Sequence, residues 1–174
     1  MSVFAKKLEL LRSYLFAKDV PSGAALVIYP PEEELAFRAG YEEVLQELGA
    51  RGIPIVVLDF RTLVFEALEE RNLLERAFKL DAKGDANARK SLATIVQREV
   101  LGRIQRTAQE SPGAVLLCKN TAALFPWISF SSILKTIEGR IDNPLIIPFP
   151  GIESGPSLHF MGVQNGYDYR AMRI

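Results

Sequence analysis

Four short apolar runs alternate with longer amphipathic segments along this chain, and this alternation constrains the fold more than any other feature. The runs cover residues 24–29, 53–58 and 114–118, and the fourth contains "IPFPG" at 147–151. Strands this short and this apolar are typical of a parallel sheet whose two faces are both covered by helices. We therefore predict an α/β fold in three layers, with a mostly parallel sheet flanked by helices and a Rossmann-like or P-loop-like outline.

The segments between the runs carry apolar residues at helical spacing. Helices are predicted near the N-terminus, from Pro31 to about Gly52, and over residues 61–80, 91–109 and 130–137. The polar stretch "DAKGDANARK", residues 81–90, interrupts two of them. Because no linker or internal repeat is visible, we expect a single α/β domain over residues 1–174.

The charge balance and the rare residues exclude several classes of function. With 21 basic and 21 acidic residues, the chain lacks the positive charge of a general nucleic-acid binder. One cysteine and one histidine cannot form an internal disulfide or a Cys/His zinc site, so we expect no metal and no cofactor. The first residues read as a charged amphipathic helix rather than a signal peptide, and no apolar run is long enough for a membrane span. We expect a cytoplasmic protein without membrane contact.

Two stretches bear a partial likeness to nucleotide-binding motifs. In "GDANARKS", residues 84–91, Lys90 and Ser91 have the spacing of a Walker A motif, but Arg89 replaces the second glycine and no strand precedes the motif. Asp59 follows a buried strand, as a Walker B or ribose-binding aspartate would, although capping the next helix explains it more simply. No GxGxxG occurs. We predict a helix start at the first stretch and a helix cap at Asp59, without a functional P-loop or ATP hydrolysis.

A cysteine nucleophile is the remaining catalytic candidate. Cys118 and His159 both lie near predicted strand ends and could form a nucleophile–base pair. Cysteine on a central strand is more often a small buried apolar residue, and His159 alternates with Leu158 and Phe160 as an outward side chain does. The chain also lacks GxSxG. We therefore expect no catalytic residue and no enzymatic activity.

The stretch "IIPFPGIESGPSLHFMG", residues 146–162, combines a strand with a dense set of glycines and prolines. Such a set prescribes the backbone path, because glycine permits conformations closed to other residues and proline fixes φ. The amides of Gly151, Gly155 and Ser157 could cradle an anion, but cradles usually lead into a helix and this stretch leads into an extended segment. A structural turn or a partner-facing hairpin is the favoured interpretation.

The segment "YDYRAMRI", residues 167–174, is aromatic and basic. Tyr167, Tyr169, Arg170 and Arg173 could stack on nucleic-acid bases, but the neutral charge of the whole chain argues against this contact. In an extended segment, Arg170 and Arg173 point to opposite faces. We expect Arg170 to tie this segment to the glycine–proline loop and Arg173 to meet another protein.

The end of the chain resembles the BrxB family of bacteriophage-exclusion (BREX) defence systems. In that family a strand leads into aromatic-Pro-Gly, then Gly-x-Ser-Leu, aromatic-x-Gly and a final Tyr-Arg-Ala-aromatic-Arg. A less specific likeness extends over nearly all of the chain. The matching residues are Phe149, Pro150, Gly151, Gly155, Ser157, Leu158, Gly162, Tyr169, Arg170, Ala171 and Arg173.

The resemblance implies a function without catalysis. Members of the family look like small α/β proteins that work beside an alkaline-phosphatase-like protein, an ATPase and a DNA methyltransferase. The expected function is a non-enzymatic component of a phage-defence complex that acts through protein–protein contacts, with the matching residues as its partner-binding candidates. The alternative is a degenerate nucleotide-binding or nucleic-acid-binding α/β protein.

Overall fold

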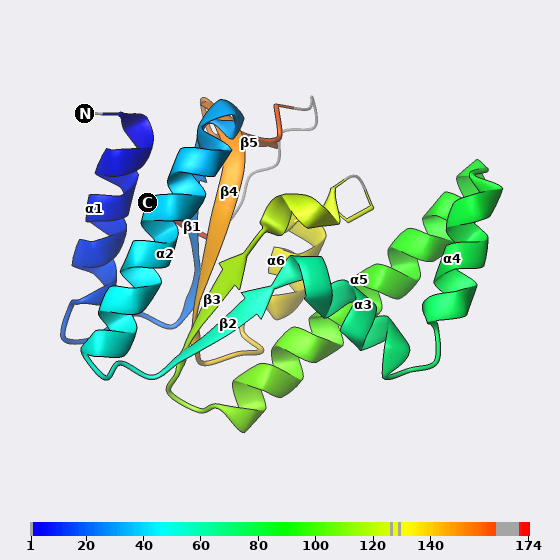
Figure 1. The fold of residues 1–174 in the computed structure, drawn as a ribbon, viewed down its shortest axis with the longest axis horizontal. Helices are drawn as coiled ribbons and strands as arrows, with labels where there is room; N and C mark the ends of the chain where they lie inside the picture. Colours follow the sequence, from blue (N-terminus) through cyan, green and yellow to red (C-terminus); the bar gives the residue numbers. More distant parts are fainter. Residues whose placement is uncertain (1, 126, 129, 163–170) are drawn as a thin grey trace.

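The sheet is mostly parallel and has six strands in the computed structural model, which describes residues 2–125, 127–128, 130–162 and 171–174 (Figure 1). The order along the sheet is β2-β3-β4-β1-β6, with every neighbouring pair on this path parallel, and β5 pairs antiparallel with β4. The strands are β1 (Gly23–Tyr29), β2 (Ile55–Asp59), β3 (Val115–Lys119), β4 (Pro144–Ser154), β5 (Ser157–Phe160) and β6 (Met172–Arg173).

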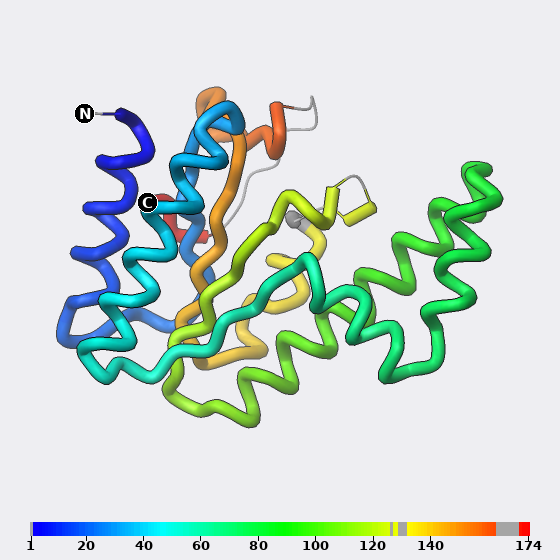
Figure 2. The backbone as a smooth tube through the Cα atoms, in the orientation of Figure 1, coloured from blue at the N-terminus to red at the C-terminus, as the bar shows by residue number. Residues whose placement is uncertain are grey.

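Helices cover both faces of the sheet, which confirms the predicted three-layer α/β fold. One face carries α1 (Val3–Leu15) and α2 (Glu34–Ala50), and a short 3-10 turn, η1 (Pro31–Glu33), precedes α2. The other face carries α3 (Phe60–Glu69), α5 (Ala86–Glu110), the turn η2 (Thr121–Leu124) and α6 (Phe130–Ile137). A further helix, α4 (Leu74–Lys83), packs on α5 and projects from the sheet with it, as the green part of the tube in Figure 2 shows.

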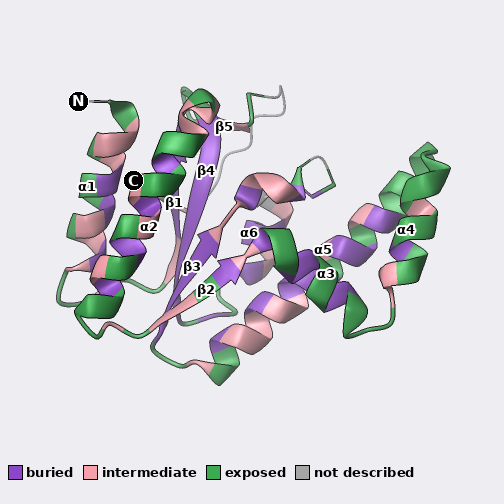
Figure 3. Ribbon diagram, viewed as in Figure 1, coloured by how far each residue is buried: buried purple, intermediate pink, exposed green. Residues whose placement is uncertain are grey.

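The apolar strands supply one core for each face. Alternate residues of β1 point in opposite directions: Leu26 and Ile28 enter the core under α3, α5 and α6, whereas Ala25 and Val27 enter the core under α1 and α2. Figure 3 shows that the central strands are buried along most of their length. The apolar stripe of α2, which closes the second core, consists of Phe37, Tyr41, Val44, Leu45 and Leu48.

Some boundaries differ from the sequence-based prediction for local reasons. The predicted helical segment 61–80 is two helices, and Asn72, with a φ of 54°, lies in the turn between them. Helix α5 begins at Ala86 rather than near Ser91, because the Asp85 carboxylate accepts a hydrogen bond from the Ala88 amide at 2.8 Å and caps the helix. The Walker-like stretch is therefore a capped helix start, as predicted.

The connections place a crevice at the carboxyl ends of the strands. The chain leaves β1 toward α2 on one face, whereas it leaves β3 through η2 toward α6 on the other face. Strand β4 lies between β1 and β3, so the two connections diverge on either side of it. Ligands of open α/β sheets bind at such a divergence, which makes this edge the first place to look for a functional site.

Candidate functional site

Asp59 ends β2 and has a structural role in the described residues. Its carboxylate accepts a hydrogen bond from the Arg61 amide at 3.0 Å, and thereby caps α3, as predicted. It also accepts from the Arg61 guanidinium at 2.8 Å and from the Asn120 side-chain amide at 2.8 Å. Burial raises the pKa of Asp59, but these hydrogen bonds outweigh it and lower the pKa to about 2. A carboxylate held in this way joins β2 to β3 and is not poised as a general base.

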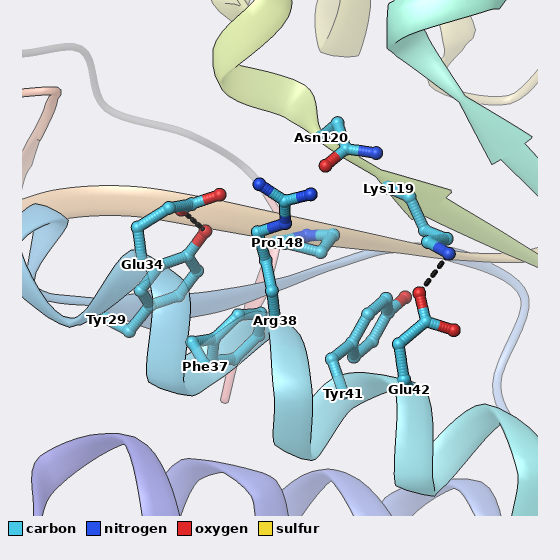
Figure 4. Close-up of a pocket in the computed structure, with 9 residues that line it drawn as sticks. All are labelled: Tyr29, Glu34, Phe37, Arg38, Tyr41, Glu42, Lys119, Asn120 and Pro148. Carbon is cyan, nitrogen blue, oxygen red and sulfur yellow. Dashed lines mark hydrogen bonds and ion pairs between the residues drawn. The ribbon is translucent and has the colours of Figure 1, made fainter.

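A small crevice lies on the other side of the strand ends, under α2. Its walls come from the ends of β1 and β3, from β4 and from successive turns of α2 (Figure 4). The space is enough for roughly one water molecule, so the crevice accepts the tip of a ligand rather than a whole nucleotide. The lining residues are Tyr29, Glu34, Phe37, Arg38, Tyr41, Glu42, Lys119, Asn120 and Pro148.

Both carboxylates of the crevice are already engaged. Glu34 accepts a hydrogen bond of 2.5 Å from the Tyr29 hydroxyl, and Glu42 forms an ion pair with Lys119. Burial raises the pKa of Tyr29, and the hydrogen bond to Glu34 raises it further, so this phenol stays protonated. The two pairs fasten α2 to β1 and to β3, respectively.

Two polar groups of the crevice remain without such a partner. The Tyr41 hydroxyl is fully buried and finds no hydrogen-bond partner among the described residues. Burial raises its pKa, and the nearby Cys118 and Glu42 add to the shift. Arg38 is exposed, and no carboxylate in the described part of the chain forms an ion pair with it. Both side chains extend from α2 toward the strand ends in Figure 4.

The glycine–proline stretch forms the predicted hairpin. Strand β4 continues past the end of β1 and turns back at residues 155–156 into β5, so the amides of this stretch do not lead into a helix as an anion cradle would. Gly155 has a φ of +60° at the first central position of the turn, as in type II′ hairpins. Met161 and Gly162, with φ values of 54° and 72°, form the turn that follows β5.

The family-motif residues of the hairpin have packing roles. A Cβ at Gly151 would lie 2.5 Å from a ring carbon of Phe149 and 2.6 Å from the His159 carbonyl oxygen, so only glycine fits. Phe149 and Leu158 are fully buried. Ser157 pairs with Ser154 beside the turn, and Pro150 accepts a hydrogen bond from the Met161 amide at 2.7 Å. These residues shape the hairpin.

One of the two terminal arginines, Arg173, makes the kind of tie that was expected of Arg170, and its expected contact with another protein stays a prediction. Its guanidinium donates a hydrogen bond to the Pro156 carbonyl oxygen at 2.6 Å, so Arg173 itself ties the end of the chain to the hairpin turn. The two groups meet because β6 pairs with β1, and β1 also pairs with β4, the strand that leads into the hairpin turn. Tyr167, Tyr169 and Arg170 lie outside the described residues, so the tie expected from Arg170 stays a prediction, as does the expectation that these residues do not stack on nucleic-acid bases.

The structure supports no cysteine nucleophile. Cys118 is fully buried on β3, as predicted, and burial raises the pKa of its thiol. His159 lies on β5 opposite Ile152. Among the described residues, no group of three or more His, Cys, Asp or Glu side chains could hold a metal ion. In the same part of the chain, no helix has the length and apolar character needed to cross a membrane.

Sequence reasoning identified the strand ends but missed the contribution of α2. By its spacing, Tyr41 belongs to the apolar stripe of α2, and its ring does pack there. Arg38 and Glu42 are four residues apart, so they lie on one side of the helix next to that stripe. The available signal was a basic and an acidic residue beside a tyrosine of the apolar stripe. This signal indicates a site only once α2 is known to pack over the end of β3.

The fold and the crevice define a class of protein, an α/β protein with a doubly covered parallel sheet and without the Walker A or dinucleotide motif at its strand ends. The model of the family described as BREX protein BrxB matches residues 56–174. The chain therefore belongs to the BrxB family and is a component of a BREX phage-defence system. The match begins after β1, so it does not include this strand, which lies between β4 and β6 in the sheet. Comparisons with curated proteins and with solved structures found no match.

Proposed function

We propose that the protein is a non-enzymatic component of a cytoplasmic BREX complex and acts through protein–protein contacts with other BREX components. The candidate partners are the alkaline-phosphatase-like protein, the ATPase and the DNA methyltransferase of these systems. The proposal has two parts, the absence of catalysis and the presence of a docking surface, and each has its own support and test.

The strand ends support the absence of catalysis. Asp59, the strongest nucleotide-binding candidate of the sequence, is engaged by Arg61 and Asn120, and the crevice beside it is too small for a nucleoside. Equilibrium binding of ATP, GTP and short DNA duplexes tests this part. We expect no saturable binding and no hydrolysis. Micromolar ATP binding that is lost in Asp59→Ala would refute this part and favour a nucleotide-binding protein.

The observation that carries the docking proposal is a group of exposed apolar side chains around the β4–β5 hairpin. We call it the hairpin surface, and it consists of Phe125, Trp127, Ile152 and Met161. Ile152 is 54% exposed and Phe125 is 41% exposed. The four residues do not share one face, because Phe125 lies against Phe160, whereas Ile152 pairs with His159 and therefore points to the opposite face of the hairpin from Phe160. Exposed apolar residues on one element and on the loop beside it are candidate contacts for a partner.

The hairpin surface is held by the core beneath it. The ring of Phe125 lies 6.3 Å from that of Phe160, and Phe160 makes an edge-on contact with the buried Phe149 at 5.1 Å. The loop after η2 and the hairpin are thereby connected through one aromatic row. A preorganised surface loses less entropy on binding than a mobile one, which favours docking there.

Co-purification with the three candidate partners tests the docking proposal. We expect the parent protein to form a stoichiometric complex with at least one of them, and Ile152→Ser combined with Phe125→Ser to weaken that complex in a protein that still melts cooperatively. Phe78→Ser is the matched control, because Phe78 is 56% exposed on α4, away from the hairpin. A parent protein that binds none of the three partners, or a double variant that binds like the parent, would contradict the proposal.

A further inference from the structure

The crevice under α2 has two unused hydrogen-bond donors that point to a ligand. Its four charged side chains are Glu34, Arg38, Glu42 and Lys119. Glu42 and Lys119 neutralise each other, and Glu34 accepts the Tyr29 hydroxyl. The positive charge of Arg38 and the Tyr41 hydroxyl have no such partner among the described residues. The four charges sum to zero, so what the crevice lacks is not charge but an acceptor for these two donors.

Tyr41 is the stronger indication of the two. A buried hydroxyl without a partner carries the cost of its desolvation, and native proteins retain few such groups. Its ring is needed in the core, where it stacks with Phe37 at 5.6 Å, but a phenylalanine would pack there equally well. The Tyr41 hydroxyl costs stability as long as it has no acceptor. A ligand that accepts hydrogen bonds from both this hydroxyl and the exposed Arg38 guanidinium would explain why the hydroxyl is present.

The size and the charge of the crevice select the kind of acceptor. The space holds only a small group, so the rest of the ligand stays outside. A planar carboxylate matches the two parallel N–H groups of a guanidinium and carries one negative charge. A phosphate is larger, and Glu34 and Glu42, which line the same space, repel its two charges more than the single charge of a carboxylate.

We propose that this crevice receives the carboxylate of an aspartate or glutamate side chain from a partner protein, with Arg38 and Tyr41 as its two donors. This inference rests on the proposed docking function and deepens it. The crevice and the hairpin surface share β4, which contributes Pro148 to the crevice and Ile152 to the hairpin surface. Pro148 and Ile152 are four residues apart on β4 and therefore lie on the same face of the strand, so one partner segment can fill the crevice while an apolar residue of it covers Ile152.

A titration followed by NMR tests the inference without any BREX partner. The probes are the peptide acetyl-Gly-Glu-Gly-amide, its glutamine counterpart and inorganic phosphate. We expect the side-chain signals of Arg38 and Tyr41 to shift saturably with the glutamate peptide and not with the glutamine peptide. Tyr41→Phe should weaken binding about 2- to 10-fold, as the loss of one hydrogen bond does, and Arg38→Gln should abolish saturation.

A control variant separates a site from general attraction to positive charge. Arg76→Gln makes the same charge change on α4, and we expect it to bind the peptide like the parent. Equal shifts with both peptides, tighter binding of phosphate, or unchanged binding in Arg38→Gln would each overturn the inference. The proposed function fails by a different result, the lack of any complex in co-purification. A complex that persists in both Arg38→Gln and Tyr41→Phe would leave that function in place and refute the crevice as its docking point.

Discussion

Replacing Gly151 by alanine should destabilise the protein more than any other single methyl addition in the hairpin. The new Cβ would lie 2.5 Å and 2.9 Å from two ring carbons of Phe149 and 2.6 Å from the His159 carbonyl oxygen. The Phe149 ring is fully buried, so it has no space to move into. The carbonyl belongs to β5 and accepts a hydrogen bond from the Gly162 amide, so moving it disturbs the strand pairing.

The expected cost follows from this crowding. Overpacking a filled core costs about 1–3 kcal/mol, and the backbone contact places Gly151→Ala at the upper end of that range. For a chain of this length, about 3 kcal/mol corresponds to a decrease of about 6–12 °C in Tm. The measurement is a thermal or urea unfolding curve followed by circular dichroism.

Gly49→Ala is the matched control for the same chemical change. Gly49 lies in α2, and a Cβ there would meet nothing within 4 Å. Alanine in a helix is more stable than glycine by up to about 1 kcal/mol, so Tm should rise by up to about 4 °C. If Gly151→Ala melts like the parent while Gly49→Ala shifts as expected, the hairpin is not packed as described, and the packing explanation of this glycine is refuted.

Four further variants test other parts of the structure. Tyr41→Phe should keep or raise the free energy of unfolding, by up to about 1 kcal/mol, because the hydroxyl it removes has no partner in the described residues; a clear loss in urea unfolding would mean that the hydroxyl is bonded. The pKa of Asp59 is about 2, below its ordinary 3.8, so its stabilisation is present above about pH 4 and lost as the pH falls toward 2. Asp59→Asn keeps a capping side chain that does not titrate, so its Tm should fall less than that of the parent between about pH 4 and pH 2. Equal decreases in Tm would refute the lowered pKa of Asp59. Cys118→Ala should cost about 1–2 kcal/mol in urea unfolding through lost packing, and the parent thiol should react with a thiol reagent only on unfolding, so rapid labelling of the native protein would contradict its burial. Arg173→Ala removes the bond to Pro156 and should lower Tm, which an unchanged melting curve would disprove.

The fold could be predicted because its local signals agree with its packing. Apolar runs such as residues 24–29 became central strands since both of their faces are covered, and Asp59 caps a helix as its position after a strand suggests. The start of α5 was misplaced because four of its first five residues are exposed and carry no apolar periodicity, although the capping aspartate was visible in the sequence.

The site was predicted less well, since it depends on contacts between distant segments. The partner of Arg173 follows from the pairing of β6 with β1, which no local pattern specifies. The roles of Arg38 and Tyr41 follow from the position of α2 over the ends of β1 and β3. The glycines of the hairpin were recognised as necessary, but the reason for Gly151 is a contact with Phe149 and not a special φ value.

The order of strands in the sheet also determines when the protein can fold during its synthesis. Strand β1 leaves the ribosome early, but its two neighbours, β4 and β6, belong to residues 144–154 and 172–173. Until those residues emerge, β1 has unpaired backbone groups along both edges and an apolar surface on both faces, a combination that favours pairing with other chains. Packing of α1 and α2 on one face of β1 would protect that face until translation reaches the other half of the sheet.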